Sequence, residues 1–228
     1  MVDSISGVGV LDKAVLVLRS LRAQGPLGLA DLQSATGLPR ATAHRLAVAL
    51  QEHGLVRRDD AGRFCLGFEL IAMGRAAAEA FPLGELARPA LIALRDATAE
   101  SVQLFVREGD ERRCVVSMQS PHGLRWIVPE GARLPLGVGS AGRVLHATAG
   151  SATSKEAWVE SVEERQPGVA SVSAAVHGVD GVVLAAVSIS GPIERLTRQP
   201  GKRFGKAVVE AAAAVSLSIE RSQRGVGL

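Results

Sequence analysis

The chain has no tyrosine, and phenylalanine and tryptophan together make up only 3% of its 228 residues. We therefore expect an aliphatic core, and the scarcity of rings argues against recognition of RNA or single-stranded DNA by stacking on aromatic side chains. Cysteine is equally scarce, with only Cys65 and Cys114. Two such distant residues exclude a disulfide framework or a zinc cluster of several cysteines, and we expect two buried free thiols.

Long apolar runs are also missing. No run approaches the roughly 20 residues of a membrane span, and the segment MVDSISGVGV has no basic start of the kind found in signal peptides. With 47% hydrophobic and 21% charged residues, the chain reads as globular, and its length suits one large or two small domains. A net charge of +3 permits an anionic partner without demanding one. We expect a cytoplasmic protein without membrane contacts.

Signals for catalysis, metal binding or a cofactor are absent as well. The five histidines show no ligand spacing such as H-x-x-x-H, and no serine–histidine–aspartate or cysteine–histidine set can be argued from position. The expectation is therefore a protein without catalytic residues, metal or cofactor.

Two helices joined by a tight turn are predicted in the segment LADLQSATGLPRATAHRLAVALQEHG, after a supporting helix at residues 10–21. Leu29, Leu32 and Ala35 recur at helical spacing, and Gly37 suits the left-handed position after a helix end. Pro39 then fits the first turn of a second helix. So short a connection forces a steep crossing, as in a helix-turn-helix.

The second of these helices has one apolar face and one small, basic face. The apolar face carries Ala43, Leu46, Ala47 and Leu50, and the opposite face carries Arg40, Ala41, His44, Arg45 and Val48. Small side chains let a helix enter the major groove of DNA, where arginine can donate two hydrogen bonds to a guanine edge. We expect Arg40, His44 and Arg45 to read bases and Thr42 to contact a phosphate.

A β-hairpin is predicted next, at residues 55–66 around the turn Asp59-Asp60-Ala61-Gly62. Val56 and Phe64 can face the helices. The three arginines of the hairpin then point toward water or a phosphate backbone: Arg57, Arg58 and Arg63. Together the helices and the hairpin form a winged helix-turn-helix, residues 1–67.

A solvated charged face is the alternative reading of the same residues, because Glu52, Asp59 and Asp60 offset the arginines. The turn, the proline start, the small outward face and the basic hairpin nevertheless agree with one another. We therefore favour DNA binding.

The rest of the chain predicts a linker helix at residues 68–82 and an α+β domain at residues 83–228. Apolar residues alternate with polar ones from Ser101 onward, as in an antiparallel hairpin. Strands are predicted at 101–106, 114–118, 124–128, 169–176 and 182–189, and helices at 83–100, 141–149, 156–164 and 204–221. The regular strand–helix alternation of a dinucleotide-binding fold is missing.

One glycine-rich stretch and several serines are candidates for ligand binding. Residues 137–142, GVGSAG, match G-x-G-x-x-G, but the preceding LPL is a poor strand in an antiparallel region, which argues against a nucleotide site. Backbone N–H groups there, with the Ser140 hydroxyl, can instead hold a small carboxylate. Further serines interrupt the apolar stretches that follow: Ser161, Ser171, Ser173, Ser188 and Ser190. They either bond neighbouring carbonyls or converge on a small-ligand pocket.

Three motifs together resemble the IclR family of bacterial transcription regulators. They are GLPRATAHRL at residues 37–46, GRFCLG at 62–67 and AAVSISGP at 185–192. The resemblance covers nearly the whole chain and implies a winged helix-turn-helix, a linker helix and a GAF-like effector domain, assembled as a homodimer or a dimer of dimers. PGVASVS at 167–173 and GPIERLTR at 191–198 are most similar to actinobacterial regulators of leucine and related amino-acid biosynthesis.

The resemblance also implies an effector pocket made of Ser140, Ala141, Ser161, Ser171, Ser188 and Ser190. Relatives that bind small keto acids commonly have aspartate at position 161 and cysteine at position 171, and the family usually has a longer helical stretch between residues 149 and 158. The implied function is regulation of a DNA operator, as a repressor or an activator, under control of a small carboxylate or amino acid. An enzyme or sensor whose helix-turn-helix contacts only proteins is the alternative.

Overall fold

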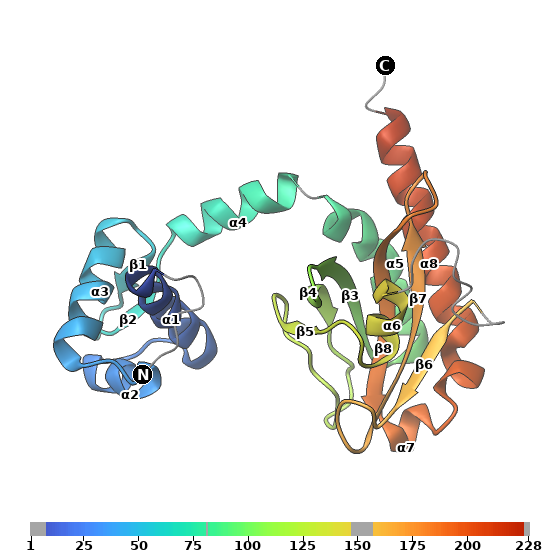
Figure 1. The fold of residues 1–228 in the computed structure, drawn as a ribbon, viewed down its shortest axis with the longest axis horizontal. Helices are drawn as coiled ribbons and strands as arrows, with labels where there is room; N and C mark the ends of the chain where they lie inside the picture. The colour runs from blue at the N-terminus through green and yellow to red at the C-terminus, as the bar shows by residue number, and fades with distance from the viewer. Residues whose placement is uncertain (1–7, 81, 147–156, 226–228) are drawn as a thin grey trace. The chain divides into compact units, whose positions relative to one another are not determined.

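The computed structural model describes residues 8–80, 82–146 and 157–225, and the chain divides into two compact units, residues 1–80 and 81–228 (Figure 1). None of the helices in the described ranges is long and apolar enough to cross a membrane. Cys65 and Cys114 are both buried and free, as predicted.

The first unit contains four helices and a two-stranded hairpin among its described residues: α1 (Gly9–Gln24), α2 (Leu29–Thr36), α3 (Arg40–Glu52), β1 (Val56–Arg58), β2 (Phe64–Leu66) and α4 (Glu69–Ala80). Gly37 ends α2 with φ 65°, in the left-handed region that the sequence predicted, and Gly54 follows α3 with φ 69°. Pro39 is the N-cap of α3, so it lies just before the first turn of the helix and not within it as predicted.

An aliphatic core with a single aromatic ring holds this unit together. Phe64 packs there with Val17, Leu32 and Val56, and all four are almost fully buried. The predicted apolar face of α3 is the buried one. Phe64 also exchanges backbone hydrogen bonds with Leu27, which ties the hairpin to the chain before α2. The side chains of α4 at residues 69–79 are exposed apart from the partly buried Leu70.

The second unit is built on a six-stranded antiparallel sheet in the order β5-β4-β3-β8-β7-β6. Its strands are β3 (Ser101–Glu108), β4 (Glu111–Met118), β5 (Arg133–Pro135), β6 (Val159–Val162), β7 (Val169–His177) and β8 (Val183–Pro192). The α+β class and the mainly antiparallel sheet are therefore confirmed.

Helices α5 (Leu83–Thr98) and α8 (Pro200–Gly225) cover one face of this sheet, and α6 (Ser140–His146) lies on the other (Figure 1). A short helix, α7 (Ile193–Leu196), precedes α8. On the side of α5 and α8, alternate strand residues such as Leu104, Val172 and Ile189 form the core. The residues between them necessarily point to the other face. Pro89 lies inside α5.

Two predicted elements were wrong. Residues 159–162 are strand β6, not part of a helix over 156–164, because they pair with β7 at the edge of the sheet. Residues 124–128 form no strand, and the strand beside β4 is β5, from the stretch judged a poor strand. Val128 instead contributes its side chain to a cluster with Cys114 and Leu136.

The predicted helix at 141–149 begins at Ser140 and is described to His146. Its last three residues lie outside the described part of the chain, as do most of the residues of the shortened 149–158 stretch. α8 starts four residues before the predicted Phe204, with Pro200 at its first position, where a missing N–H costs nothing.

Candidate functional site

The outward face of α3 is the first candidate surface. Arg40, His44 and Arg45 are exposed and Thr42 is partly exposed, while the buried residues of α3 hold the opposite face against the core. The aromatic ring of Phe64 lies edge-on to His44, with ring centroids 6.4 Å apart. The sequence-predicted base-reading and phosphate-contacting residues of α3 therefore share one accessible face.

The arginines of the hairpin are exposed too, but they differ in what they contact. Arg58 lies over the ring of Phe64 at 4.1 Å and donates a hydrogen bond from Nη1 to the carbonyl of Gly62, 2.7 Å away. Arg57 lies over the ring of Phe68 at 4.9 Å. These contacts orient both guanidinium groups while leaving them accessible to an anion.

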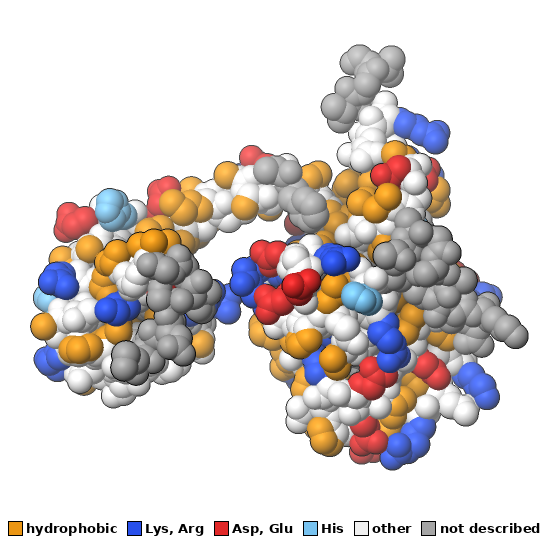
Figure 2. Space-filling model, viewed as in Figure 1, with side chains coloured by type: hydrophobic (Ala, Val, Ile, Leu, Met, Phe, Trp, Pro, Cys, Tyr) orange, Lys and Arg blue, Asp and Glu red, His pale blue; other side chains and the backbone are white. Residues whose placement is uncertain are grey.

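Arg63 is already neutralised. Its Nε and Nη2 atoms both lie 2.8 Å from the Oδ2 atom of Asp59 and form an ion pair with that carboxylate. Hydrogen bonding from Arg63 lowers the pKa of Asp59. The Asp59 Oδ1 atom also accepts the backbone N–H groups of Ala61 and Arg63, so this carboxylate organises the turn. Figure 2 shows basic side chains scattered over the visible face of this unit, without one continuous basic patch.

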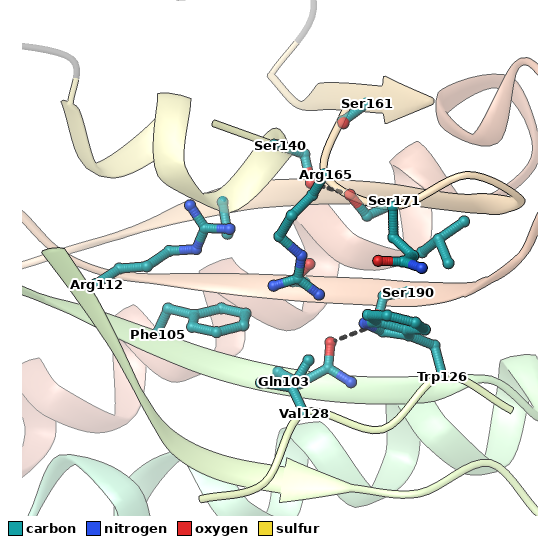
Figure 3. Close-up of a pocket in the computed structure, with 15 residues that line it drawn as sticks. Gln103, Phe105, Arg112, Trp126, Val128, Ser140, Ser161, Arg165, Ser171 and Ser190 are labelled. Carbon is teal, nitrogen blue, oxygen red and sulfur yellow. Dashed lines mark hydrogen bonds between the residues drawn. The ribbon is translucent and has the colours of Figure 1, made fainter. Parts of the chain in front are cut away.

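The second candidate site is a cavity in the second unit, on the sheet face opposite α5 and α8. It holds about 30 Å³ of cavity volume, within about 420 Å³ of empty space that includes its open mouth. All six residues predicted for the effector pocket line it: Ser140, Ala141, Ser161, Ser171, Ser188 and Ser190. Figure 3 shows several of them around the cavity.

Strand register explains why distant serines meet. Ser171 is directly opposite Ser161 on β6 and Ser190 on β8, so these three share one row across the sheet. In the adjacent row, Ser188 lies between Ser173 on β7 and Gln103 on β3. Residues paired in register face the same side, and here that side is the cavity, because the alternate residues fill the core beneath.

A chain of hydroxyl groups connects the floor of this cavity to α6. The Ser140 Oγ atom shares hydrogen bonds of 2.7 Å with the Oγ atoms of both Ser171 and Ser173, and Ser173 donates to Ser188 at 2.9 Å. These hydroxyls are thus partly satisfied by one another. The glycine-rich stretch has no free anion-binding geometry at Gly139, whose N–H donates to Glu164 Oε2 at 3.0 Å.

The structure also corrects the reason for rejecting a dinucleotide site. A strand, β5, does precede the GVGSAG stretch, and α6 does follow it. However, β5 pairs antiparallel with β4, so the parallel strand–helix–strand unit that the dinucleotide motif requires is still missing.

Sequence reasoning missed the charged and aromatic half of the cavity. It is lined by Arg112 of β4 and Arg165 of the β6–β7 loop, with Gln103, Phe105 and Trp126 beside them. A signal existed in Gln103, a polar residue between Val102 and Leu104 in a strand covered on both faces. Without the register, however, nothing related it to residues about 60 to 90 positions later.

Comparison with known proteins places this geometry in a family. A model described as the IclR helix-turn-helix domain matches residues 10–60, and one described as the C-terminal domain of bacterial transcriptional regulator IclR matches 75–161 and 151–217. The glycerol operon regulatory protein of Streptomyces coelicolor is 31% identical over 90% of this chain and 94% of its own. The transcriptional repressor IclR of Escherichia coli is 26% identical over 85% of this chain and 83% of its own.

Solved structures agree on the fold. The crystal structure of an IclR homologue complexed with 4-hydroxybenzoate, from Microbacterium hydrocarbonoxydans, matches with a TM-score of 0.75 at 19% identity, over 93% of this chain and 99% of the other. The Thermotoga maritima IclR structure matches with a TM-score of 0.73 at 19% identity, over 92% of this chain and 98% of the other.

Proposed function

The chain belongs to the IclR family of bacterial transcriptional regulators, and we propose that it binds an operator in double-stranded DNA with an affinity controlled by a small-molecule effector. The relatives are regulators and not enzymes, so the expectation of a regulator over an enzyme is confirmed. The observation that carries the proposal is α3, whose inner face is buried and whose outer face presents Arg40, His44 and Arg45.

In this proposal α3 enters the major groove, and its three exposed basic side chains read base edges. Thr42, Arg57 and Arg58 contact phosphates, with a smaller contribution from Arg63 because Asp59 already neutralises it. A homodimer or dimer of dimers would present recognition helices to half-sites about 34 Å apart on one face of B-DNA, in the cytoplasm.

The effector would occupy the cavity lined by Ser140, Ala141, Ser161, Ser171, Ser188 and Ser190. Hydroxyl, amide and guanidinium groups converge there beside the side chains of Phe105, Trp126 and Val128, which supports a small carboxylate or amino acid as the effector. Control of amino-acid biosynthesis rests on the motifs at 167–173 and 191–198 alone, since the similar proteins include the glycerol operon regulatory protein of Streptomyces coelicolor and the acetate operon repressor of Salmonella typhimurium. Repression as the mode of control is supported by two relatives that are repressors, Escherichia coli IclR and the Salmonella typhimurium acetate operon repressor.

Binding of the purified protein to its own upstream promoter fragment, against random DNA of equal length and at several salt concentrations, tests the function. We expect a specific excess of about 10³-fold or more. Equal and steeply salt-sensitive binding to both fragments would contradict an operator in that fragment. No DNA binding at all, with or without candidate effectors, would favour a helix-turn-helix that contacts only proteins.

A further inference from the structure

Two arginines face the same cavity without an acid to neutralise them. Arg112 and Arg165 approach it from opposite walls, and Figure 3 shows both guanidinium groups directed into the space above Phe105. Within the described ranges, no carboxylate lies within 4.0 Å of either guanidinium. Buried charges are ordinarily paired, so this arrangement requires an explanation.

Arg112 is built into the wall of the cavity. Its side chain is only 3% exposed, and Nη1 donates hydrogen bonds to the carbonyls of Pro135 and Val138. The guanidinium lies 5.4 Å from the ring centroid of Phe105. Its Nε–H group is buried and has no hydrogen-bond partner among the described residues. The carbonyl contacts hold the group in place but leave its charge uncompensated.

Arg165 comes from the loop between β6 and β7 and is half-buried. Its guanidinium lies 5.3 Å from the ring centroid of Trp126, which is its only cation–π contact with a described residue. The neighbouring acid cannot serve it, because the Glu164 carboxylate forms an ion pair with Arg143 and accepts the N–H of Gly139. The cavity therefore keeps two positive charges of its own.

The positive charges of Arg112 and Arg165 repel one another. Burial lowers the pKa of Arg112 to about 10, and the charge of Arg165 contributes to this decrease. Burial also lowers the pKa of Arg165. Both groups stay protonated at neutral pH, so their proximity carries an electrostatic cost that a bound anion would reduce.

Two neutral donors complete the cavity. Gln103 is 1% exposed, and its Nε2 group has no partner among the described residues, although its Oε1 accepts a hydrogen bond from Ser190 at 2.8 Å. The buried Nε1–H group of Trp126 is likewise unpartnered in the described part of the chain. Each of these four side chains therefore keeps at least one donor group without an acceptor among the described residues, and a ligand with acceptor oxygens would supply what is missing.

We propose that the effector is a small dicarboxylate, with one carboxylate at Arg112 and the other at Arg165 and with its carbon skeleton against Phe105, Trp126 and Val128. This inference rests on the proposed function and specifies its effector. A planar guanidinium matches a carboxylate in two-point geometry, and the ring and valine side chains suit a hydrocarbon spacer better than a sugar or a phosphate ester. Two carboxylates give each arginine its own acidic partner.

Calorimetric titration and thermal melting of the full chain with succinate, glutarate and phthalate test the charge requirement. Succinamate is the monoanion matched to succinate, and benzoate is the monoanion matched to phthalate. Phenyl phosphate supplies a dianion that carries a phosphate ester in place of carboxylates. We expect at least one dicarboxylate to bind about tenfold or more tightly than its matched monoanion and to raise the melting temperature. Equal binding of dicarboxylates and monoanions, tighter binding of phenyl phosphate, or no binding of any dicarboxylate would overturn the assignment.

The variant Arg165→Gln tests whether the dicarboxylate binds at this arginine. Arg165 donates no hydrogen bond to a described residue, so the variant should fold with an unchanged or higher melting temperature, because a half-buried unpaired charge is gone. It should lose the advantage of the dicarboxylate over the monoanion, whereas Arg88→Gln, which changes a partly exposed arginine of α5, should retain it. An unchanged preference in Arg165→Gln would contradict the proposal.

Operator binding separates this inference from the proposed function. A chain that binds operator but prefers no dicarboxylate would overturn the effector assignment and leave the regulator intact. A chain that prefers dicarboxylates but binds no DNA would overturn the proposed function and leave the assignment intact.

Discussion

At the scale of single residues, arginines of similar exposure have different tasks according to their neighbours. Arg45 projects from α3 with no ion-pair partner among the described residues, Arg58 stacks on Phe64, and Arg63 is paired with Asp59. The sequence places all three on the DNA side but cannot rank them. The ranking follows from which charges are already compensated.

Arg45→Ala tests base reading. We expect the variant to weaken operator binding by about 1–3 kcal/mol while binding to random DNA changes little, because a base-edge contact carries specificity. Arg57→Ala, which removes a phosphate contact, should weaken both by similar amounts. Fluorescence anisotropy with operator and random duplexes at fixed salt measures both effects. Equal losses on the two duplexes for Arg45→Ala would rule out its role as a reader.

Asp59→Asn tests the neutralisation of Arg63. The amide keeps an oxygen for the N–H groups of Ala61 and Arg63 but removes the charge that holds the guanidinium. A freed Arg63 should strengthen binding to operator and random DNA alike and steepen the salt dependence by about one unit of log–log slope. In the unaltered chain the pKa of Asp59 is lowered, so the ion pair persists above that pKa and is lost only as the pH falls through it. Unchanged affinity and slope in the variant would show that Arg63 is remote from the DNA.

At the scale of elements, the junction between the hairpin and α4 depends on one small residue. Gly67 donates its N–H to the carbonyl of Leu55 at 2.9 Å, and a Cβ atom there would lie 1.9 Å from the carbonyl oxygen of Gly54. Backbone cannot move away as a flexible side chain would. The conformation of the GRFCLG motif therefore requires glycine at its last position.

Gly67→Ala should destabilise the first unit by about 1–3 kcal/mol, the range of overpacking in a closed site. Gly74→Ala is the matched control, because a Cβ atom there meets nothing within 4 Å and the position lies within α4. It should stabilise the chain by roughly 0.5–1 kcal/mol through helix propensity. Urea unfolding followed by circular dichroism compares the two. A Gly67→Ala variant as stable as the unaltered chain would contradict the close approach.

At the scale of the whole molecule, function requires communication between two units that each have their own core. An effector that changes operator affinity by some factor must have its own affinity changed by operator DNA by the same factor. This reciprocity does not depend on the path of the signal through the molecule.

We expect the best-binding dicarboxylate to change operator affinity by about 5–150-fold, the usual range of allosteric coupling. Calorimetric titration of that dicarboxylate into the chain, with and without saturating operator, should return the same factor. Random DNA of equal length is the control. An identical dicarboxylate affinity in the presence and absence of operator would disprove coupling between the cavity and the DNA-binding surface.

Elements with purely local causes were predictable from the sequence. Gly37 and Gly54 mark helix ends because only a residue without Cβ takes their left-handed conformation cheaply, and the buried face of α3 follows from its 3.6-residue period. The hairpin turns at 59–62 and 109–110 are local in the same way. The resemblance to the IclR family further predicted which serines line the cavity.

The other features depend on contacts between distant parts of the chain. Residues 159–162 are a strand because β7 offers them an open edge, and Arg112 and Arg165 converge because β4 and the β6–β7 loop meet around the same sheet face. Pairing between strands joins residues dozens of positions apart, and no short-range period encodes which strand lies beside which. The charge of the cavity, and with it the effector that we propose, is therefore a property of the folded sheet.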